Sequence, residues 1–272
     1  MQTHSAHPVS MATGLWLHRE LIMALVRREI VGRYRGSVMG LLWSFFNPVL
    51  MLAVYTFVFS VVFKARWTGG SESRVEFALV LFSGLMVFNI FAESINRAPG
   101  LVLGNANYVK KVIFPLEILP VVTLGASGFH FLISFAVWLV FYLLFFGIPP
   151  ATLLWLPLTL LPLLPMTLGL SWLLASLGVY LRDVAQVVGV LTTILMFMSP
   201  IFYPIQALPQ DFQFVMQLSP LSGIIEQARN AMIWGQGIEW EVWSVQMLLS
   251  MAVGWCGFAW FQKTRKGFAD VI

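Results

Sequence analysis

Four arginines stand within nine positions, directly before an apolar stretch: Arg27, Arg28, Arg33 and Arg35. A guanidinium group is planar and always charged, and it forms charge-assisted hydrogen bonds with phosphate or carboxylate oxygens. The apolar stretch that follows carries the aromatic residues Trp43 and Phe46 near its start. Positive charge therefore ends where an apolar, aromatic segment begins. Such a boundary is typical of the inner face of a membrane, where arginines gather beside a membrane span.

Composition indicates an integral membrane protein. Of the 272 residues 59% are hydrophobic and 10% are charged, and the mean hydropathy is +0.83. The single cysteine, Cys256, cannot form an internal disulfide, and no Cys/His spacing indicates a metal site. The first apolar run, residues 21–26, is too short for a secretory signal.

The fold class expected is an all-α membrane protein with six transmembrane helices. Apolar segments of about 20 residues cross a bilayer as helices. We expect the spans at residues 38–63, 77–96, 118–146, 153–180, 184–203 and 242–261. Several exceed the required length, so tilt or the kinks at Pro48, Pro157, Pro162 and Pro165 must accommodate the excess. The domains are then a 1–37 N-terminal segment with an interfacial helix, a 38–261 membrane domain and a 262–272 tail.

The distribution of charge predicts cytoplasmic termini. The side that carries both termini holds twelve of the sixteen Lys and Arg residues and six carboxylates, whereas the other side holds four and six. Cytoplasmic loops are the ones enriched in Lys and Arg.

Two connections look structured. Residues 206–238 are too polar for a span but contain two apolar-periodic pieces, 209–218 and 221–234, split at Ser219 and Pro220. This pattern favours an exterior re-entrant helical hairpin over an ordinary amphipathic segment at the surface. Residues 99–116, which include Lys110 and Lys111, read as a short cytoplasmic helix along the membrane.

Smaller features leave alternatives open. Asp183 can cap the helix that follows it, with Gln186 closing a capping box. Gly32, Gly36 and Gly40 are spaced four apart, which suits close packing of one helix face, either within the chain or against a second copy.

Some expected chemistry is missing. No phosphate-binding loop of the Gly-x-x-x-x-Gly-Lys-Ser/Thr type occurs, so the chain is not expected to bind ATP in that way. The span interiors hold His130, with Glu93 and Arg97 near one end, but no other charged side chain. A single histidine of this kind is most often a hydrogen-bonded core residue, and ion-coupled transporters usually carry several ionisable groups. Aromatic residues inside spans are mostly lipid-facing, although their faces also suit neutral sugar rings.

Five segments together resemble the transmembrane permease subunit of ABC-2-type exporters for lipid-linked polysaccharides, closest to the O-antigen branch. They are "RYRGSVMGLLWSFFNP" at 33–48, "NYVKKVIFPLEILP" at 107–120, "LRDVAQ" at 181–186, "MSPIFYPIQALP" at 198–209 and "LSPLSGIIEQAR" at 218–229. Many members of that family have Asn where Ser219 stands, which leaves the helix break intact.

The resemblance implies a homodimer joined to two copies of a separate ATPase, which binds the ATP and Mg²⁺, so this chain itself is not an enzyme and has no cofactor. The substrate would be a polyprenyl-linked polysaccharide, and no nucleic acid is expected. The residues expected to couple to the ATPase are Asn107, Tyr108, Lys110, Lys111, Phe114, Arg182 and Asp183. The exterior gate would contain Pro209, Ser219, Pro220, Glu226 and Arg229.

The same resemblance implies a conduit along spans one and five, lined by Trp43, Phe46, Tyr55, Phe197, Phe202 and Tyr203. The four arginines at 27, 28, 33 and 35 would hold the carrier diphosphate or a lipid headgroup, or contact the ATPase. Two other functions stay open: an ABC-2 permease for a drug or small lipid, and a membrane glycosyltransferase. The latter normally needs clustered carboxylates, which the loops lack. A non-transporting scaffold would not explain the hairpin.

Overall fold

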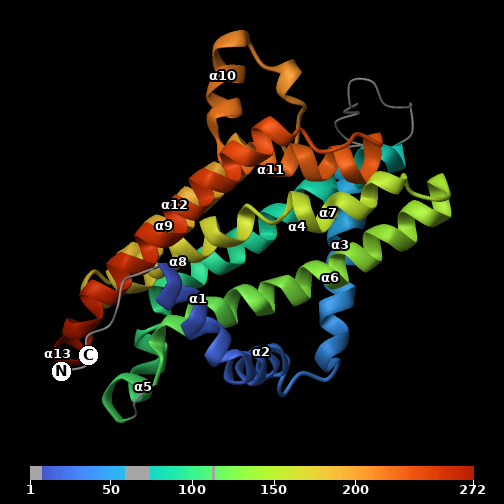
Figure 1. The fold of residues 1–272 in the computed structure, drawn as a ribbon. Coiled ribbons are helices and arrows are strands. Elements are labelled where there is room, and N and C mark those ends of the chain that lie inside the picture. The colour runs from blue at the N-terminus through green and yellow to red at the C-terminus, as the bar shows by residue number, and fades with distance from the viewer. Residues whose placement is uncertain (1–7, 59–73, 112–113) are drawn as a thin grey trace.

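The computed structural model describes residues 8–58, 74–111 and 114–272, and these residues form helices and turns without any strand (Figure 1). The α-helices are α1 (Pro8–Leu17), α2 (Arg19–Arg33), α3 (Trp43–Tyr55), α4 (Arg74–Arg97), α5 (Ala106–Lys111), α6 (Leu119–Phe146), α7 (Leu156–Thr159), α8 (Leu163–Tyr180), α9 (Val184–Met198), α10 (Gln210–Leu218), α11 (Pro220–Arg229), α12 (Trp240–Thr264) and α13 (Phe268–Val271). Single turns join them at η1 (Gly40–Leu42), η3 (Ala98–Gly100), η4 (Leu103–Asn105), η5 (Leu116–Ile118), η6 (Ala151–Trp155), η7 (Ile205–Ala207), η8 (Asn230–Trp234) and η9 (Arg265–Gly267).

Four helical stretches of the described chain are long and apolar enough to cross a membrane: Val75–Gly100, Leu116–Phe146, Ala151–Tyr180 and Trp240–Val271. They coincide with four of the six spans expected from the sequence. The first and fifth expected spans correspond to shorter apolar helices, Trp43–Val58 and Val184–Met198. Residues 59–63, the end of the first expected span, lie outside the described residues. Length and composition therefore give four candidate spans in the described chain, and the count of six stays a prediction.

Helix α4 lies at the centre of the bundle. It packs against α3, α6, α8, α9 and α11, and 83% of its most apolar window is buried. Trp138 of α6 is fully buried, and its indole Nε1 donates a hydrogen bond to the backbone oxygen of Leu79 in α4 at 3.2 Å. Burying an indole N–H without an acceptor would be costly, so this bond favours one position of α6 along the axis of α4.

Helices α8 and α12 form the most extensive pair in the bundle. Their backbones meet where Gly169 faces Gly257, and a β-carbon on Gly257 would collide with the carbonyl oxygen of Gly169. Small residues allow such a close approach of two helices. Trp172 and Phe258 pack edge to face beside this contact, with ring centroids 5.2 Å apart.

The stretch Ala151–Tyr180 is broken rather than continuous. A single turn, η6, leads into α7, and α8 begins only at Leu163, after Pro162. Proline lacks the backbone N–H that would continue the helical ladder and its ring crowds the preceding turn, so Pro157 and Pro162 interrupt the helix. We expected tilt or proline kinks to take up the extra length of this span. Here the prolines break the helix.

The glycine pattern at 32, 36 and 40 does not make a helix face. Helix α2 ends at Arg33, and Gly36 and Gly40 have φ angles of 85° and 50° in the loop before α3. Only glycine adopts such angles without strain. The expectation of one bare helix face across these three positions was wrong, because Gly32 lies on α2 whereas Gly36 and Gly40 serve the turn after it, and no β-carbon at any of them would meet a neighbour of this chain within 4 Å.

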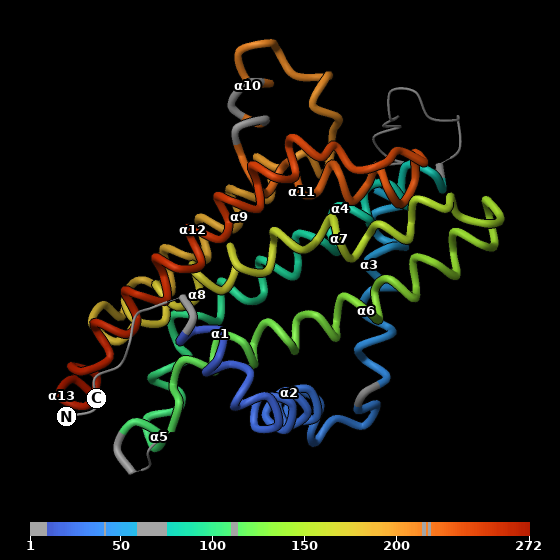
Figure 2. The backbone as a smooth tube through the Cα atoms, viewed as in Figure 1, coloured from blue at the N-terminus to red at the C-terminus, as the bar shows by residue number. Residues whose placement is uncertain are grey.

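The two ends of the bundle differ. Helices α10 and α11 cap one end, whereas α2, α5 and α13 lie toward the other, as the tube in Figure 2 also shows. The break between α10 and α11 falls at Ser219, whose hydroxyl accepts from the backbone N–H of Ser222, and Pro220 occupies the first helical position. The predicted division of this segment into two helices is confirmed. The C-terminal segment is packed rather than loose, since Phe268 is fully buried.

Candidate functional site

A polar cluster joins the end of α2 to α4 and α6. The guanidinium of Arg33 forms an ion pair with Glu93, Nη2 to Oε1, at 2.5 Å. On the other side of the same carboxylate, Nδ1 of His130 lies 3.0 Å from Oε2 of Glu93. The hydroxyl of Tyr34 lies 3.3 Å from Nε2 of His130, and Arg97 pairs with Glu29. Three helices are thus tied together by groups that neutralise one another.

His130 is therefore a hydrogen-bonded residue, as the sequence indicated. Its partners come from α2 and α4, so it does not stand alone inside an apolar span. The positions of Glu93 and Arg97 near one end of a span were evident from the sequence, but the ion pair of Glu93 with Arg33 was not predicted. The available signal was the i, i+4 spacing of Glu93 and Arg97, which indicates one polar patch on α4.

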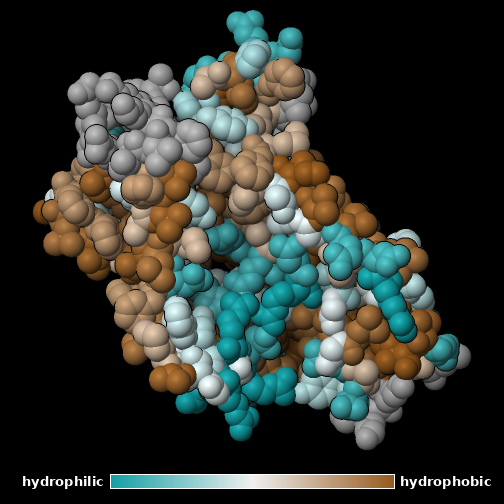
Figure 3. All heavy atoms as spheres, turned by 180° about the vertical axis from the view of Figure 1, so that it is seen from behind, coloured by the Kyte–Doolittle hydropathy of each residue, from teal (hydrophilic) through white to brown (hydrophobic). Residues whose placement is uncertain are grey.

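A cavity of about 330 Å³ adjoins this cluster, between α3, α4 and α6. Hydroxyl and amide groups line much of it: Tyr34, Ser44, Asn47, Tyr55, Asn89, Asn96, Ser127 and Ser134. Such groups both donate and accept hydrogen bonds, as sugar hydroxyls do. The view from behind in Figure 3 shows hydrophilic surface gathered in a hollow with hydrophobic surface on both sides.

The aromatic residues expected along the conduit are not all brought together. Tyr55 lines the 330 Å³ cavity, but Trp43 and Phe46 do not; they are 43% and 39% exposed on the outside of α3. Phe197, near the end of α9, is 59% exposed, and its ring stacks on Phe202 with centroids 5.4 Å apart.

Phe202 and Tyr203 were expected on the fifth span, but they lie beyond it. Helix α9 ends at Met198, and Ser199 is extended, with φ −91° and ψ 151°. The expected boundary was wrong because Pro200 has no N–H to continue the helix and disfavours a helical conformation of the residue before it. The hydroxyl of Tyr203 donates back to the carbonyl oxygen of Phe197 at 2.6 Å and closes the turn.

The four clustered arginines have different surroundings. Arg33 belongs to the ion-pair cluster. Arg28 donates to the hydroxyl of Tyr108 at 2.8 Å, which links α2 to α5. All four are exposed, but Arg27 and Arg35 form no ion pair or side-chain hydrogen bond among the described residues. Of the four, these last two are the ones placed to meet an anionic group from solvent or lipid.

The segment around α5 is held from two sides. The rings of Tyr108 and Phe114 stack with centroids 4.3 Å apart. Arg265, after α12, donates to the Glu117 carboxylate at 2.6 Å and to the carbonyl oxygen of Phe114 at 2.7 Å. Tyr108 thus contacts α2, whereas Phe114 and Glu117 contact the segment that follows α12.

The other residues expected at the coupling surface lie around this segment. Asn107 is exposed on α5. Lys110 and Lys111 are the last two residues of that helix, and the structure describes their backbone only. Arg182 and Asp183 are exposed in the turn between α8 and α9, where Asp183 occupies the N-cap position without a side-chain hydrogen bond to the helix.

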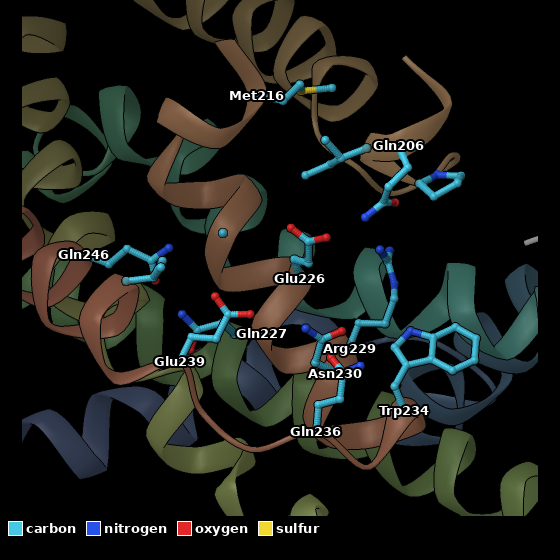
Figure 4. Close-up of a pocket in the computed structure, with 14 residues that line it drawn as sticks. Gln206, Met216, Glu226, Gln227, Arg229, Asn230, Trp234, Gln236, Glu239 and Gln246 are labelled. Atoms are coloured by element: carbon cyan, nitrogen blue, oxygen red, sulfur yellow. The ribbon is translucent and has the colours of Figure 1, made fainter. Parts of the chain in front are cut away.

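A second, larger cavity of about 890 Å³ lies at the hairpin end, beneath α10 and beside α11 and α12 (Figure 4). Gln206, Glu226 and Arg229 face one another across it in Figure 4. Pro209 is the exposed N-cap of α10, and the α10–α11 break lies above. Burial raises the pKa of Glu226, an effect that the charge of Arg229 partly opposes.

Arg229 is a buried anchor. It is 3% exposed, and its Nε donates to the carbonyl oxygen of Val80 in α4 at 3.4 Å. Burial lowers the pKa of this guanidinium to about 10, so it stays charged at neutral pH. Gly84 leaves the space for it, since a β-carbon there would lie 2.6 Å from Nη2. The side chain thereby fastens α11 to the central helix.

The chain is similar in sequence to known membrane transport proteins over most of its length. The sequence pattern of the family described as "ABC-2 type transporter" matches residues 20–233. The chain is 26% identical over 254 residues to the O-antigen export system permease protein RfbA of Klebsiella pneumoniae, covering 93% of this chain and 95% of that protein. A protein of the same name from Myxococcus xanthus is 26% identical over 260 residues, covering 95% and 97%. The polysialic acid transport protein KpsM of Escherichia coli is 24% identical over 250 residues, covering 89% and 93%.

Proposed function

The chain belongs to the ABC-2 type transporter family, and from this premise we propose that it is the membrane permease subunit of a polysaccharide exporter. The observation that carries the proposal is the extent of its similarity to O-antigen export permeases, which runs through 93% or more of the chain. It includes the hairpin and the segment around α5. The similarity therefore covers the membrane helices and also the hairpin and the α5 segment that connect them.

The polar cavity supports a hydroxyl-rich substrate. The amides of Asn47 and Asn89 and the hydroxyl of Tyr55 offer hydrogen-bond donors and acceptors to the 330 Å³ cavity. The charged groups that line it are already paired with one another. A neutral glycan can exchange its water contacts for such groups without bringing in a counter-charge. A small apolar drug would gain little from them.

The working assembly in this proposal is a homodimer of six-span subunits joined to two copies of an ATPase subunit that binds ATP and Mg²⁺. It lies in the cytoplasmic membrane of a bacterium with both termini inside. α3 and α9 then act as the first and fifth spans despite their short regular parts. Trp43, Phe46 and Phe197, exposed on the single chain, would face the conduit between copies.

The carrier of the glycan would be a polyprenyl diphosphate, met at the inner face by the exposed Arg27 and Arg35. Arg33 is paired with Glu93, and Arg28 is hydrogen-bonded to Tyr108. In this proposal these two arginines link α2 to α4 and α5 and do not bind the phosphate. Tyr108, with its neighbours on α5, would contact the ATPase, and α10–α11 would gate the outer mouth.

Deleting the gene in its native host tests the proposal. We expect the surface polysaccharide to disappear and polyprenyl-linked polymer to accumulate inside the cell, with both effects reversed by the intact chain expressed from a plasmid. Unchanged surface polysaccharide, together with loss of resistance to a drug or a change in membrane lipids, would favour a permease for a drug or small lipid.

A further inference from the structure

The 890 Å³ cavity at the hairpin end contains a buried amide without a partner. Gln227 of α11 is 6% exposed and lines the cavity. Neither its Oε1 nor its Nε2 has a hydrogen-bond partner in the described part of the chain. Burying an amide in this state costs roughly 1–3 kcal/mol. A group placed at such a cost, facing a cavity, is suited to bind something that enters it.

The remaining lining has a consistent chemistry. Four further amide side chains surround the space, and one tryptophan stands at its edge: Gln206, Asn230, Gln236, Gln246 and Trp234. Amides donate and accept hydrogen bonds at once, which matches the hydroxyl groups of a sugar. An indole offers a flat apolar face for the C–H side of a sugar ring. Figure 4 shows Gln206 on the turn before α10, Asn230, Trp234 and Gln236 in and just after the turn that follows α11, and Gln246 on α12.

The charges in the cavity disfavour an anionic ligand. Two carboxylates, Glu226 and Glu239, line it together with one guanidinium, Arg229. That guanidinium is engaged with the carbonyl oxygen of Val80 and lies in the field of Glu226. A diphosphate would find two carboxylates and only one guanidinium, which is already engaged, whereas an uncharged sugar needs no counter-charge.

The size of the cavity limits the ligand. Sites for small molecules in proteins range over about 300–1,000 Å³, so this space admits a short stretch of sugars and not a folded polymer. We propose that the cavity formed by α11, α12 and the 204–206 segment binds an uncharged saccharide segment of the exported polymer, with Gln227 as its main polar contact. This inference rests on the proposed function and adds to it a sugar-binding site beside the hairpin of each chain.

The test compares two buried glutamines. Gln227→Met removes the amide at nearly constant side-chain shape. The matched control is Gln262→Met in α12, because Gln262 is also buried, at 5% exposed, but does not line the cavity. Each full-length variant is purified in lipid nanodiscs. The probe is the set of oligosaccharides released by mild acid from the host's own surface polysaccharide, and binding is measured by saturation-transfer NMR and by titration.

We expect Gln227→Met to weaken oligosaccharide binding about tenfold, the equivalent of about 1.4 kcal/mol. Its thermal stability should be unchanged or higher, because the lost amide had no partner in the fold. Gln262→Met should bind like the parent chain. A structural amide gives the opposite pattern: Gln227→Met would lower stability and leave binding intact, and this result would overturn the proposal. Inorganic pyrophosphate competing for the site in a Gln227-dependent way would also overturn it.

Export in cells separates this inference from the proposed function. At matched membrane abundance, Gln227→Met should lower surface polysaccharide while the Gln262 control does not. If deletion of the gene abolishes surface polysaccharide but Gln227→Met exports and binds normally, only the sugar site fails. If deletion changes nothing, the proposed function fails first.

Discussion

Arg33 and Glu93 stand 60 residues apart in the sequence, yet their side chains form an ion pair of 2.5 Å where α2 meets the central helix α4. His130 of α6 contacts the same carboxylate. One acidic group thus joins the end of α2 to both α4 and α6, beside the second ion pair between Arg97 and Glu29. Because this group has only 19% of its side chain exposed, its charge depends on its partners.

Replacing Glu93 by Gln should destabilise the chain. The amide keeps the shape but leaves the positive charge of Arg33 without its counter-charge, and we expect the free energy of unfolding to fall by about 1–3 kcal/mol. The measurement is denaturation of the purified chain in a mild detergent. Glu20→Gln, an exposed change on α2, is the control and should alter stability by less than about 0.5 kcal/mol. Equal stability of the two variants would mean that the ion pair contributes nothing to folding.

Tyr108 should connect α2 to the segment that we propose contacts the ATPase, through two separable contacts. Tyr108→Phe removes the hydrogen bond from Arg28 but keeps a ring to stack on Phe114, whereas Tyr108→Ala removes both. We expect export to fall moderately in the first variant and severely in the second, while both chains still reach the membrane. Surface polysaccharide and co-purification of the ATPase are the readouts. Full export by Tyr108→Ala would show that this link is dispensable.

The contact between α8 and α12 depends on the absence of side chains. In Gly257→Ala the new methyl group would collide with the carbonyl oxygen of Gly169, so the helices must separate and stability should fall by about 1–3 kcal/mol. Gly128→Ala in α6 is the matched control, because nothing lies within 4 Å of its β-carbon position. Alanine there should stabilise the helix by about 0.5–1 kcal/mol. Thermal unfolding of both variants, followed by circular dichroism, gives the comparison.

Features with a local signal could be predicted from the sequence. Apolar length located the four long spans. The break between α10 and α11 followed from Ser219 and Pro220, a hydroxyl that caps a helix and an imino acid suited to its first turn. The end of α9 was placed too late, although Pro200 carried the signal, because the apolar run continues past it.

Features that depend on how helices are rotated could not be predicted. Arg33, Glu93 and His130 come from three helices, and nothing in one segment shows which residues of another it will meet. The same holds for α3, which is apolar around most of its circumference, so its pattern does not distinguish the packed face from the exposed one. Gln227 was missed for a related reason: its lack of partners is a property of the packed bundle.

The final prediction concerns the two faces of α3. One face, with Asn47 and Tyr55, lines the 330 Å³ cavity. A second face carries Trp43 and Phe46, which lie three residues apart in the first turn and are exposed on the single chain; it borders the first face, because Trp43 precedes Asn47 by one helical turn. If the proposed homodimer places this second face along the conduit, its rings supply stacking surface for sugars. If lipid covers it, the rings only contribute to packing.

Changing Trp43 and Phe46 together to Ala should therefore lower export while leaving dimer assembly and ATPase association intact. At position 43, Phe or Tyr should restore export better than Leu, because a flat aromatic face is needed and bulk alone does not provide it. Asn47→Leu serves as the comparison on the cavity face, where the loss concerns hydrogen bonds instead of stacking. The measurement is surface polysaccharide at matched membrane abundance. Full export by the double Ala variant, or equal rescue by Leu, would assign the exposed face to lipid and leave Asn47 and Tyr55 as the side of α3 that the glycan meets.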